Sequence, residues 1–397
     1  MNPVSFLPVI ACLALALLTT YAITRRYGAP PLSGRYASID GLRGYLAFLV
    51  FLHHACIWYF YLRSGSWAKP PSYFYTNFGQ GGVALFFMIT AFLFYAKLLA
   101  SRERGVDWTR LYLSRLLRLT PLYLFAMALM LTIVAVLSGG RPGEPWPQLL
   151  QHLLQWLSFT ALGAPDLNGV RDTAVIVAGV TWSLPYEWLF YLSLPVLALP
   201  LRIAVPRPYL LVSAALLLLL VAAVVLKRPP PHHLFAFVAG MVAAVLVQYP
   251  GFRRFADGPA AAVLTAAALG VAIFLFPSAH DALALLALAV AFALIAGGCR
   301  LFGSLTWSVS RTFGEFAYSL YLLHGIFLFV IFNFVLGPAQ AQDLSPLQHW
   351  AVVAAATPAL IAACYLSFRF IEQPAMLRVP ALHAWLSRSP APSNMPR

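Results

Sequence analysis

Long apolar runs separated by short polar segments form the hydrophobic pattern of the chain. Each run has about 20 residues, the length that an α-helix needs to cross the hydrocarbon core of a bilayer. The pattern predicts eleven such helices, at approximately residues 5–24, 44–62, 79–99, 117–137, 180–200, 208–226, 232–249, 259–277, 281–299, 315–336 and 349–370. The predicted fold class is therefore all-α, a polytopic membrane helix bundle, with no internal repeat and no soluble domain.

Composition agrees with a membrane protein. Of the 397 residues, 61% are hydrophobic and 10% are charged, and the mean hydropathy is +0.80. A soluble globular domain of this length could not carry so much apolar surface.

The first apolar run has the length of a signal peptide but not its charge pattern. Arg25 and Arg26 follow the run, and no basic residue precedes it. A signal peptide has its basic segment before the apolar core. We therefore expect an uncleaved helix whose N-terminus lies outside the cell.

Basic residues predict the orientation of the other helices, because Lys and Arg concentrate in cytoplasmic loops. With the N-terminus outside, the cytoplasmic segments are 25–43, 97–118, 201–208, 250–258, 300–314 and 369–397. They hold 20 of the 26 basic residues. The other six, in the predicted outside loops, are Arg63, Lys69, Arg141, Arg171, Lys227 and Arg228. We expect a multi-pass protein of a bacterial inner membrane with a cytoplasmic C-terminus. The same distribution explains the net charge of +14, so no nucleic-acid binding is expected.

The cysteines and the longest loop give weaker signals. The four cysteines lie in separate predicted helices without a CxxC pair, so neither a disulfide framework nor a metal site is expected.

In the segment 138–178, an apolar stretch at 149–162 predicts a helix in the outer interface. That helix could cover a substrate cleft or could only connect two spans.

Polar residues in the second predicted helix give the first functional signal. Arg43 and His54 are eleven residues apart, about three helical turns, so their side chains share one face. Arg43 at the cytoplasmic rim suits a phosphate-bearing donor, and the deeper His54 suits proton transfer. Alternatively, Arg43 snorkels and His54 bonds a neighbouring helix. For His53, on another face, we favour that packing role.

Two further helices carry polar side chains on one face. Ser183, Glu187 and Tyr191 are spaced i, i+4, i+8, so they share one face of a helix that begins near Pro185. Glu187 could contact an acceptor or position His54, or it could make a structural interhelical bond.

On the tenth predicted helix, Tyr321 and His324 share a face, whereas Glu315 lies on the opposite one. Glu315 and His324 therefore cannot form a catalytic dyad. His324 is a candidate for either the site or packing.

Basic residues also occur at cytoplasmic helix ends. Arg115 and Arg118, at an i, i+3 spacing, could clamp donor phosphates or only anchor the helix at the membrane surface. Arg369 and Glu372 have the same spacing, and we expect them to pair with each other.

Several stretches resemble, in order, the signature of the acyltransferase-3 family of integral membrane O-acyltransferases. IDGLRGYLAFLVFLHHA resembles the family's opening pattern, an Arg, ten residues and a His, which maps onto Arg43 and His54. Thr90 and Ala91 stand where Ser-Gly is usual. The remaining stretches are GGVALFFMITAFLF (81–94), RLLRLTPLYL (115–124), TWSLPYEWLFYLSLP (181–195), FAYSLYLLHGIF (316–327) and RFIEQP (369–374).

The resemblance implies a fold and a reaction. A ten-helix domain at 36–377 would follow an extra helix and linker at 1–35 and precede a cytoplasmic tail at 378–397, without an SGNH-type esterase domain. The implied reaction moves an acyl group, commonly acetyl, from cytoplasmic acyl-CoA to a hydroxyl of a cell-surface or exported glycan, glycolipid or similar small acceptor. Acyl-CoA is then a co-substrate, no cofactor is tightly bound, and membrane lipid surrounds the chain.

The resemblance and the residue patterns together assign candidate roles. His54 and Glu187 are the catalytic candidates, with His54 either a general base or the carrier of a covalent acyl group. Arg43, Arg115 and Arg118 are the donor-binding candidates. The substrate-binding candidates are Asp40, Ser183, Tyr191, Tyr321 and His324.

Two other classes of function remain open. A transporter or flippase of a lipid-linked or small-molecule substrate would show paired broken helices related by a repeat. A non-catalytic scaffold or sensor would not need Arg43 and His54 on one face.

Overall fold

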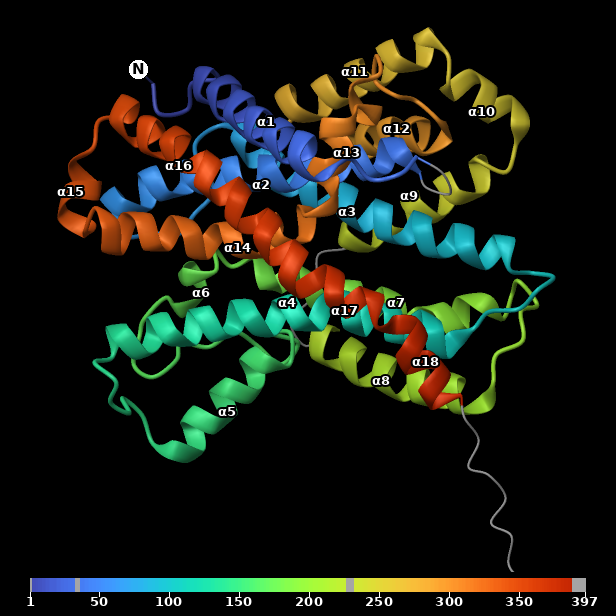
Figure 1. Ribbon diagram of the computed structural model, residues 1–397, viewed down its shortest axis with the longest axis horizontal. Helices are drawn as coiled ribbons and strands as arrows, with labels where there is room; N and C mark the ends of the chain where they lie inside the picture. Colours follow the sequence, from blue (N-terminus) through green and yellow to red (C-terminus); the bar gives the residue numbers. More distant parts are fainter. Residues whose placement is uncertain (1, 33–35, 226–231, 388–397) are drawn as a thin grey trace, which may run out of the picture.

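The computed structural model describes residues 2–32, 36–225 and 232–387, and its regular structure there is helical (Figure 1). Parts of the predicted linker and tail, at 33–35 and 388–397, lie outside the described residues, as do Lys227 and Arg228 of a predicted outer loop.

Each of the eleven predicted apolar segments contains a helix, although the ends shift by several residues. These helices are α1 (Leu7–Tyr27), α2 (Ala37–Ser64), α3 (Tyr73–Ala100), α4 (Trp108–Leu137), α7 (Leu184–Ala198), α8 (Arg207–Val225), α9 (His232–Leu246), α11 (Pro259–Phe274), α12 (Ala282–Gly297), α14 (Ala317–Val330) and α16 (Pro346–Ser367). The shorter helices are α5 (Trp146–Leu157), α6 (Thr173–Ile176), α10 (Pro250–Ala256), α13 (Ser308–Glu315), α15 (Pro338–Asp343), α17 (Gln373–Leu377) and α18 (Val379–Leu386).

The length and composition of the helices indicate a polytopic membrane bundle. Within the described residues, six helical segments are long and apolar enough to cross a membrane, or seven if the bent pair α9 and α10 forms one span. Helices α8, α11 and α12 are apolar but shorter. Helices are suited to this environment because they satisfy their own backbone hydrogen bonds in lipid.

Local sequence signals set several helix ends. Asp107 begins α4 by accepting a hydrogen bond from the Arg110 backbone N–H at 2.9 Å. Ser345 and Gln348 form a capping box at the start of α16. Helix α2 ends at Gly65, whose φ of 67° suits the left-handed conformation that commonly ends a helix.

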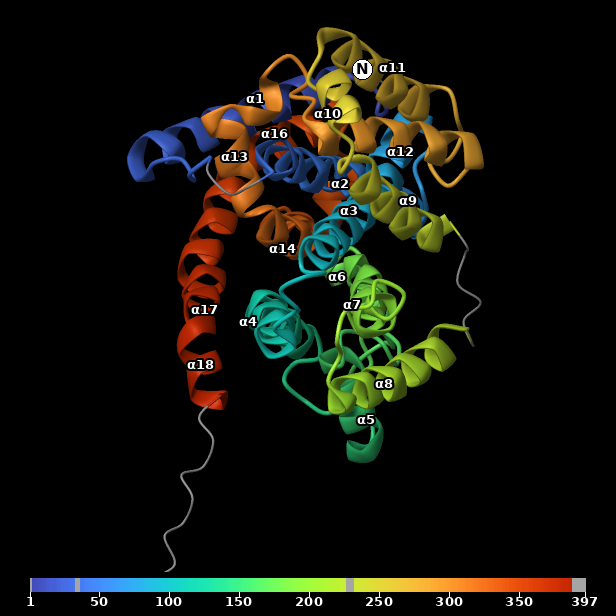
Figure 2. The ribbon, with the colours of Figure 1, turned by 90° about the vertical axis from the view of Figure 1, so that its right-hand side faces the viewer.

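Helices α2, α3 and α14 lie in the middle of the bundle. In both Figure 1 and Figure 2, α4, α5, α7 and α8 lie on one side of them, and α1, α11, α12, α13 and α16 lie on the other. Helix α2 packs against α3, α13 and α14. Glycine permits the closest of these approaches, since a Cβ added to Gly314 of α13 would lie 1.6 Å from the Asp40 carbonyl oxygen.

Two predicted spans are less regular than the hydropathy pattern implied. The segment 180–200 begins with a 3₁₀ turn, Val180–Ser183, before α7 starts at Leu184. Pro185 lies in the first turn of α7, where its missing N–H has no partner to lose. The segment 232–249 ends where the chain bends by 107° between α9 and α10, just before Pro250.

The predicted interfacial helix at 149–162 corresponds to α5, which begins and ends earlier. Trp146 and Leu150 are exposed, as such a helix requires, but Trp156 is fully buried. Its Nε1 donates a hydrogen bond to the Pro165 carbonyl at 3.0 Å. The Trp156 ring therefore packs inside the protein, on the side of α5 opposite to its exposed residues.

Candidate active site

One cavity of about 330 Å³ gathers most of the predicted site residues. Its lining comes from α2, α3, α4, α7 and α14, with contributions from the segments around them. Eight of the ten predicted residues are in this lining: Asp40, Arg43, Arg115, Arg118, Ser183, Glu187, Tyr191 and Tyr321. The fold thus brings together residues from four distant parts of the sequence.

Helix α7 presents its polar face to the cavity, as its spacing predicted. The Tyr191 hydroxyl donates a hydrogen bond to the Glu187 carboxylate one turn earlier. Ser183 Oγ lies 2.8 Å from the hydroxyl of Tyr321 on α14, and both groups are within 3.1 Å of the Val180 carbonyl oxygen. This wall of the cavity therefore carries two hydrogen-bonded groups, the Tyr191–Glu187 pair and the Ser183–Tyr321 pair.

The arginines of the lining have different surroundings. The Arg115 guanidinium lies 4.9 Å from the centre of the Phe94 ring, in a cation–π contact. Arg118 Nη1 lies 3.6 Å from a carboxylate oxygen of Glu372, which is fully buried. Glu372 also accepts a hydrogen bond from the Ser319 hydroxyl. Arg118 therefore has a structural partner, in addition to facing the cavity.

The predicted pairing of Arg369 with Glu372 is wrong. Arg369 hydrogen-bonds to the Gln373 side chain at the surface, whereas Glu372 turns inward to Arg118. The cause is a π-helical turn, Phe368–Glu372, at this end of α16. A π turn is wider than an α turn, so residues at an i, i+3 spacing no longer share a face.

Charges in the lining balance. The carboxylates of Asp40, Glu187 and Glu315 face the same cavity as the three arginines. A lining of this kind offers donors and acceptors to a polar substrate without a large field of one sign.

The other two predicted residues, His54 and His324, form a pair outside the described cavity lining. Nδ1 of His54 lies 3.0 Å from Nε2 of His324, and the ring centres are 5.1 Å apart. Tyr321 connects this pair to the cavity, since its ring centre lies 6.4 Å from that of His324. Trp67 stacks on the other side of His54 at 6.0 Å.

Backbone contacts assign the hydrogens of the two rings. Nδ1 of His324 lies 2.9 Å from the Leu320 carbonyl, and Nδ1 of His54 lies 3.0 Å from the Val50 carbonyl. A carbonyl oxygen only accepts, so each neutral ring carries its hydrogen on Nδ1. The single hydrogen on Nδ1 of His54 is then shared between the Val50 carbonyl and Nε2 of His324. This arrangement leaves Nε2 of His54 unprotonated, as a general base requires.

His53 has the surroundings of a packing residue. Its Nδ1 lies 2.8 Å from the Tyr75 carbonyl of α3. The ring also occupies space that only glycine leaves open, because a Cβ on Gly79 would lie 2.4 Å from it.

Several lining residues were not singled out from the sequence. Tyr318 precedes Tyr321 by three residues, so its helical spacing could have indicated it. Phe86, Phe87 and Phe94 add an aromatic wall from α3, but they could not be distinguished from other core aromatics by sequence. Trp67, which stacks on His54 outside the cavity lining, lies between two helices in a segment with no periodic signal.

Comparison with known proteins finds one family. A family model described as an acyltransferase domain matches residues 36–369. No curated protein and no solved structure matches the chain.

Proposed function

The chain belongs to the acyltransferase-3 family and is a membrane acyltransferase, and from this premise we propose its donor and acceptor. It transfers an acetyl group from cytoplasmic acetyl-CoA to a hydroxyl of a cell-surface or exported glycan or glycolipid. One observation carries the proposal: eight candidate residues surround one cavity, and Tyr321 links that cavity to the paired imidazoles of His54 and His324.

The size of the cavity supports a short acyl group. A volume of about 330 Å³ is at the lower end of the range for ligand pockets, roughly 300–1,000 Å³. It has room for an acetyl thioester and part of the carrier arm. The bulky nucleotide of coenzyme A would remain at the cytoplasmic rim, on the side of Arg43.

The tautomer of His54 supports direct transfer. Nε2 of His54 would accept the proton of the acceptor hydroxyl while the hydroxyl oxygen bonds to the thioester carbonyl carbon. The carbon–sulfur bond breaks, and the coenzyme A thiolate leaves and takes up the proton from His54. His324 would stabilise the protonated His54 ring by accepting from its Nδ1.

An acyl-histidine intermediate is the other route. Nε2 of His54 would attack the thioester carbon, release coenzyme A thiolate and then pass the acyl group to the acceptor oxygen. This route would also carry the acyl group between the two sides of the membrane.

The transporter alternative has less support. A carrier built from repeats is expected to contain two broken helices in corresponding positions. Within the described residues, one bent helix pair, α9 and α10, meets the criterion for a broken or re-entrant span.

The function can be tested in cells that express either the wild-type chain or His54→Ala at equal levels. Surface glycans, glycolipids and exported small molecules would be compared by mass spectrometry before and after mild alkali, which removes O-acetyl esters. We expect at least one alkali-labile acetylated species to require the wild-type chain. Identical acylation in both strains, or in a strain without the protein, would contradict the proposal.

We also propose eleven crossings with an outside N-terminus and a cytoplasmic C-terminus, because this topology puts most basic residues inside. Reporter fusions after Arg110 and Arg397 should then read as cytoplasmic, and fusions after Gly65 and Asp343 should read as outside. A cytoplasmic reading at Gly65 would separate Arg43 from a cytoplasmic donor and reject this orientation.

A further inference from the structure

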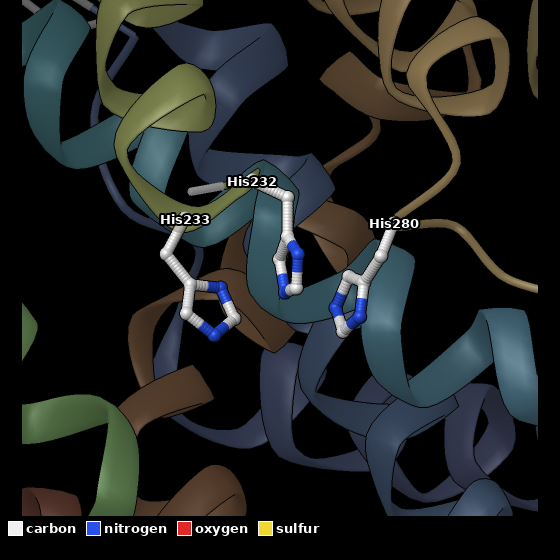
Figure 3. Close-up of side chains that lie close together, drawn as sticks. All are labelled: His232, His233 and His280. Atoms are coloured by element: carbon white, nitrogen blue, oxygen red, sulfur yellow. The ribbon is translucent and has the colours of Figure 1, made fainter. Parts of the chain in front are cut away.

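Three histidines from two parts of the chain lie close together (Figure 3), and none of them is in the described cavity lining. His232 and His233 begin α9, and His280 lies in the loop between α11 and α12. One ring nitrogen from each can be chosen so that all three lie within 4.8 Å of one another. The rings of His232 and His280 stack, with centres 3.6 Å apart, and Figure 3 shows the His233 ring beside them.

The cluster contains an unsatisfied polar atom. Nε2 of His232 is buried and has no hydrogen-bond partner among the described residues. Such an atom is costly to bury, because it loses its contact with water without replacement.

The loop that carries His280 is held in position. The side-chain oxygen of Gln80 on α3 accepts hydrogen bonds from Ser278 Oγ at 2.7 Å and from the Ala279 backbone N–H at 3.2 Å. The His280 backbone N–H donates to Ser278 Oγ at 3.1 Å. Supporting bonds of this kind orient the ligands of metal sites.

We propose that His232, His233 and His280 bind one divalent transition-metal ion of the zinc class. Imidazole nitrogen suits zinc, copper and nickel, whereas magnesium and calcium prefer oxygen. Zinc–nitrogen bonds of about 2.0–2.1 Å in a tetrahedral site place the nitrogens roughly 3.4 Å apart. The three chosen nitrogens lie within 4.8 Å of one another, so binding would require the side chains to rotate and bring them closer by up to about 1.4 Å. Three protein ligands leave a fourth position for water or another small ligand.

The ion would link the start of α9 to the α11–α12 loop and thereby stabilise one wall of the cavity. The His233 ring centre lies 4.8 Å from that of Trp182 and 5.0 Å from that of Tyr186. Trp182 and Tyr186 immediately precede Ser183 and Glu187 of the lining in the sequence. The metal site does not depend on the identity of the acyl donor or acceptor.

The test uses the full chain, purified in detergent with a tag that contains no histidine and treated with a chelator. Binding of Zn²⁺ and Co²⁺ would be measured by titration and by metal analysis after dialysis. We expect about one ion per chain. His280→Ala should weaken binding by at least about tenfold, the scale seen when metal-site residues are lost. His383→Ala is the matched control, because His383 pairs with Asp107 elsewhere in the fold, and it should bind the ion as the wild type does.

Equal affinity in His280→Ala and the wild type would overturn the proposal, as would the absence of stoichiometric binding. If His280→Ala does not remain monodisperse, the Co²⁺ complex of the wild-type chain decides. Visible absorption bands of a tetrahedral, nitrogen-ligated Co²⁺ would support the site, and their absence would reject it.

Discussion

Replacing His54 with alanine should lower acyl transfer by at least about 10²-fold, the contribution expected of a general base, while donor binding survives. The reason lies in the two ring nitrogens. Nδ1 is committed to the Val50 carbonyl and to His324, so Nε2 is the atom left to accept a proton. Arg43 and Arg115, which line the cavity, are unchanged in this variant. Donor affinity and single-turnover acyl transfer would be measured on purified protein in nanodiscs.

Two neighbouring histidines provide the comparison. His53→Ala should retain most activity, because the ring of His53 bonds the Tyr75 backbone. His324→Leu should lower transfer, since Nδ1 of His54 loses an acceptor, and His324→Gln should restore part of it because an amide oxygen can accept the same hydrogen bond. An inactive His53→Ala variant together with an active His54→Ala variant would show that the role of general base has been assigned to the wrong histidine.

If His324→Gln transferred the acyl group no faster than His324→Leu, His324 would be only a packing residue. This outcome would leave His54 as the base, since the Val50 carbonyl alone can fix its tautomer. The two variants therefore separate the role of the pair from the role of His54 itself.

Hydropathy predicted the helical segments because a lipid environment leaves the backbone few alternatives. All eleven apolar segments contain a helix. The 3₁₀ turn before α7, the π turn at Glu372 and the bend before α10 were not predicted, because they depend on packing between helices. The burial of Trp156 was missed for the same reason, since an aromatic residue on an amphipathic helix can face either lipid or protein.

Residue spacing predicted the cavity lining only in part. Ser183, just before α7, and Glu187 and Tyr191 within α7 line the cavity as expected. Arg43 also lines it, whereas His54, expected on the same face of α2, does not. The contact between His54 and His324 could not be predicted, because it depends on how α2 and α14 cross. The same limit explains why the sequence predicted no metal site: His280 is separated from His232 and His233 by two helices.

Two of the three cavity arginines should have different roles, with Arg43 binding the donor and Arg118 supporting the fold. Arg43→Ala should weaken acyl-CoA binding by roughly 10–100-fold, corresponding to about 1.5–3 kcal/mol for a charge-assisted hydrogen bond. The maximal rate should change less, because the contact would exist in the ground state as well as in the transition state. Arg43→Lys should recover only part of the affinity, since an ammonium cannot form two parallel bonds to a phosphate.

Arg118→Ala is the informative contrast, because Arg118 lines the same cavity but lies 3.6 Å from the buried carboxylate of Glu372. Removing one partner of a buried ion pair costs about 3–5 kcal/mol of stability, so this variant should unfold at a lower temperature. Arg118→Ala combined with Glu372→Gln should recover stability, because no unpaired carboxylate remains. Melting curves and donor affinities measured on the same preparations distinguish the two roles. An Arg43→Ala protein that melts early yet binds acyl-CoA normally would mean that Arg43, too, acts through the fold, and the donor would then have to be held by Arg115.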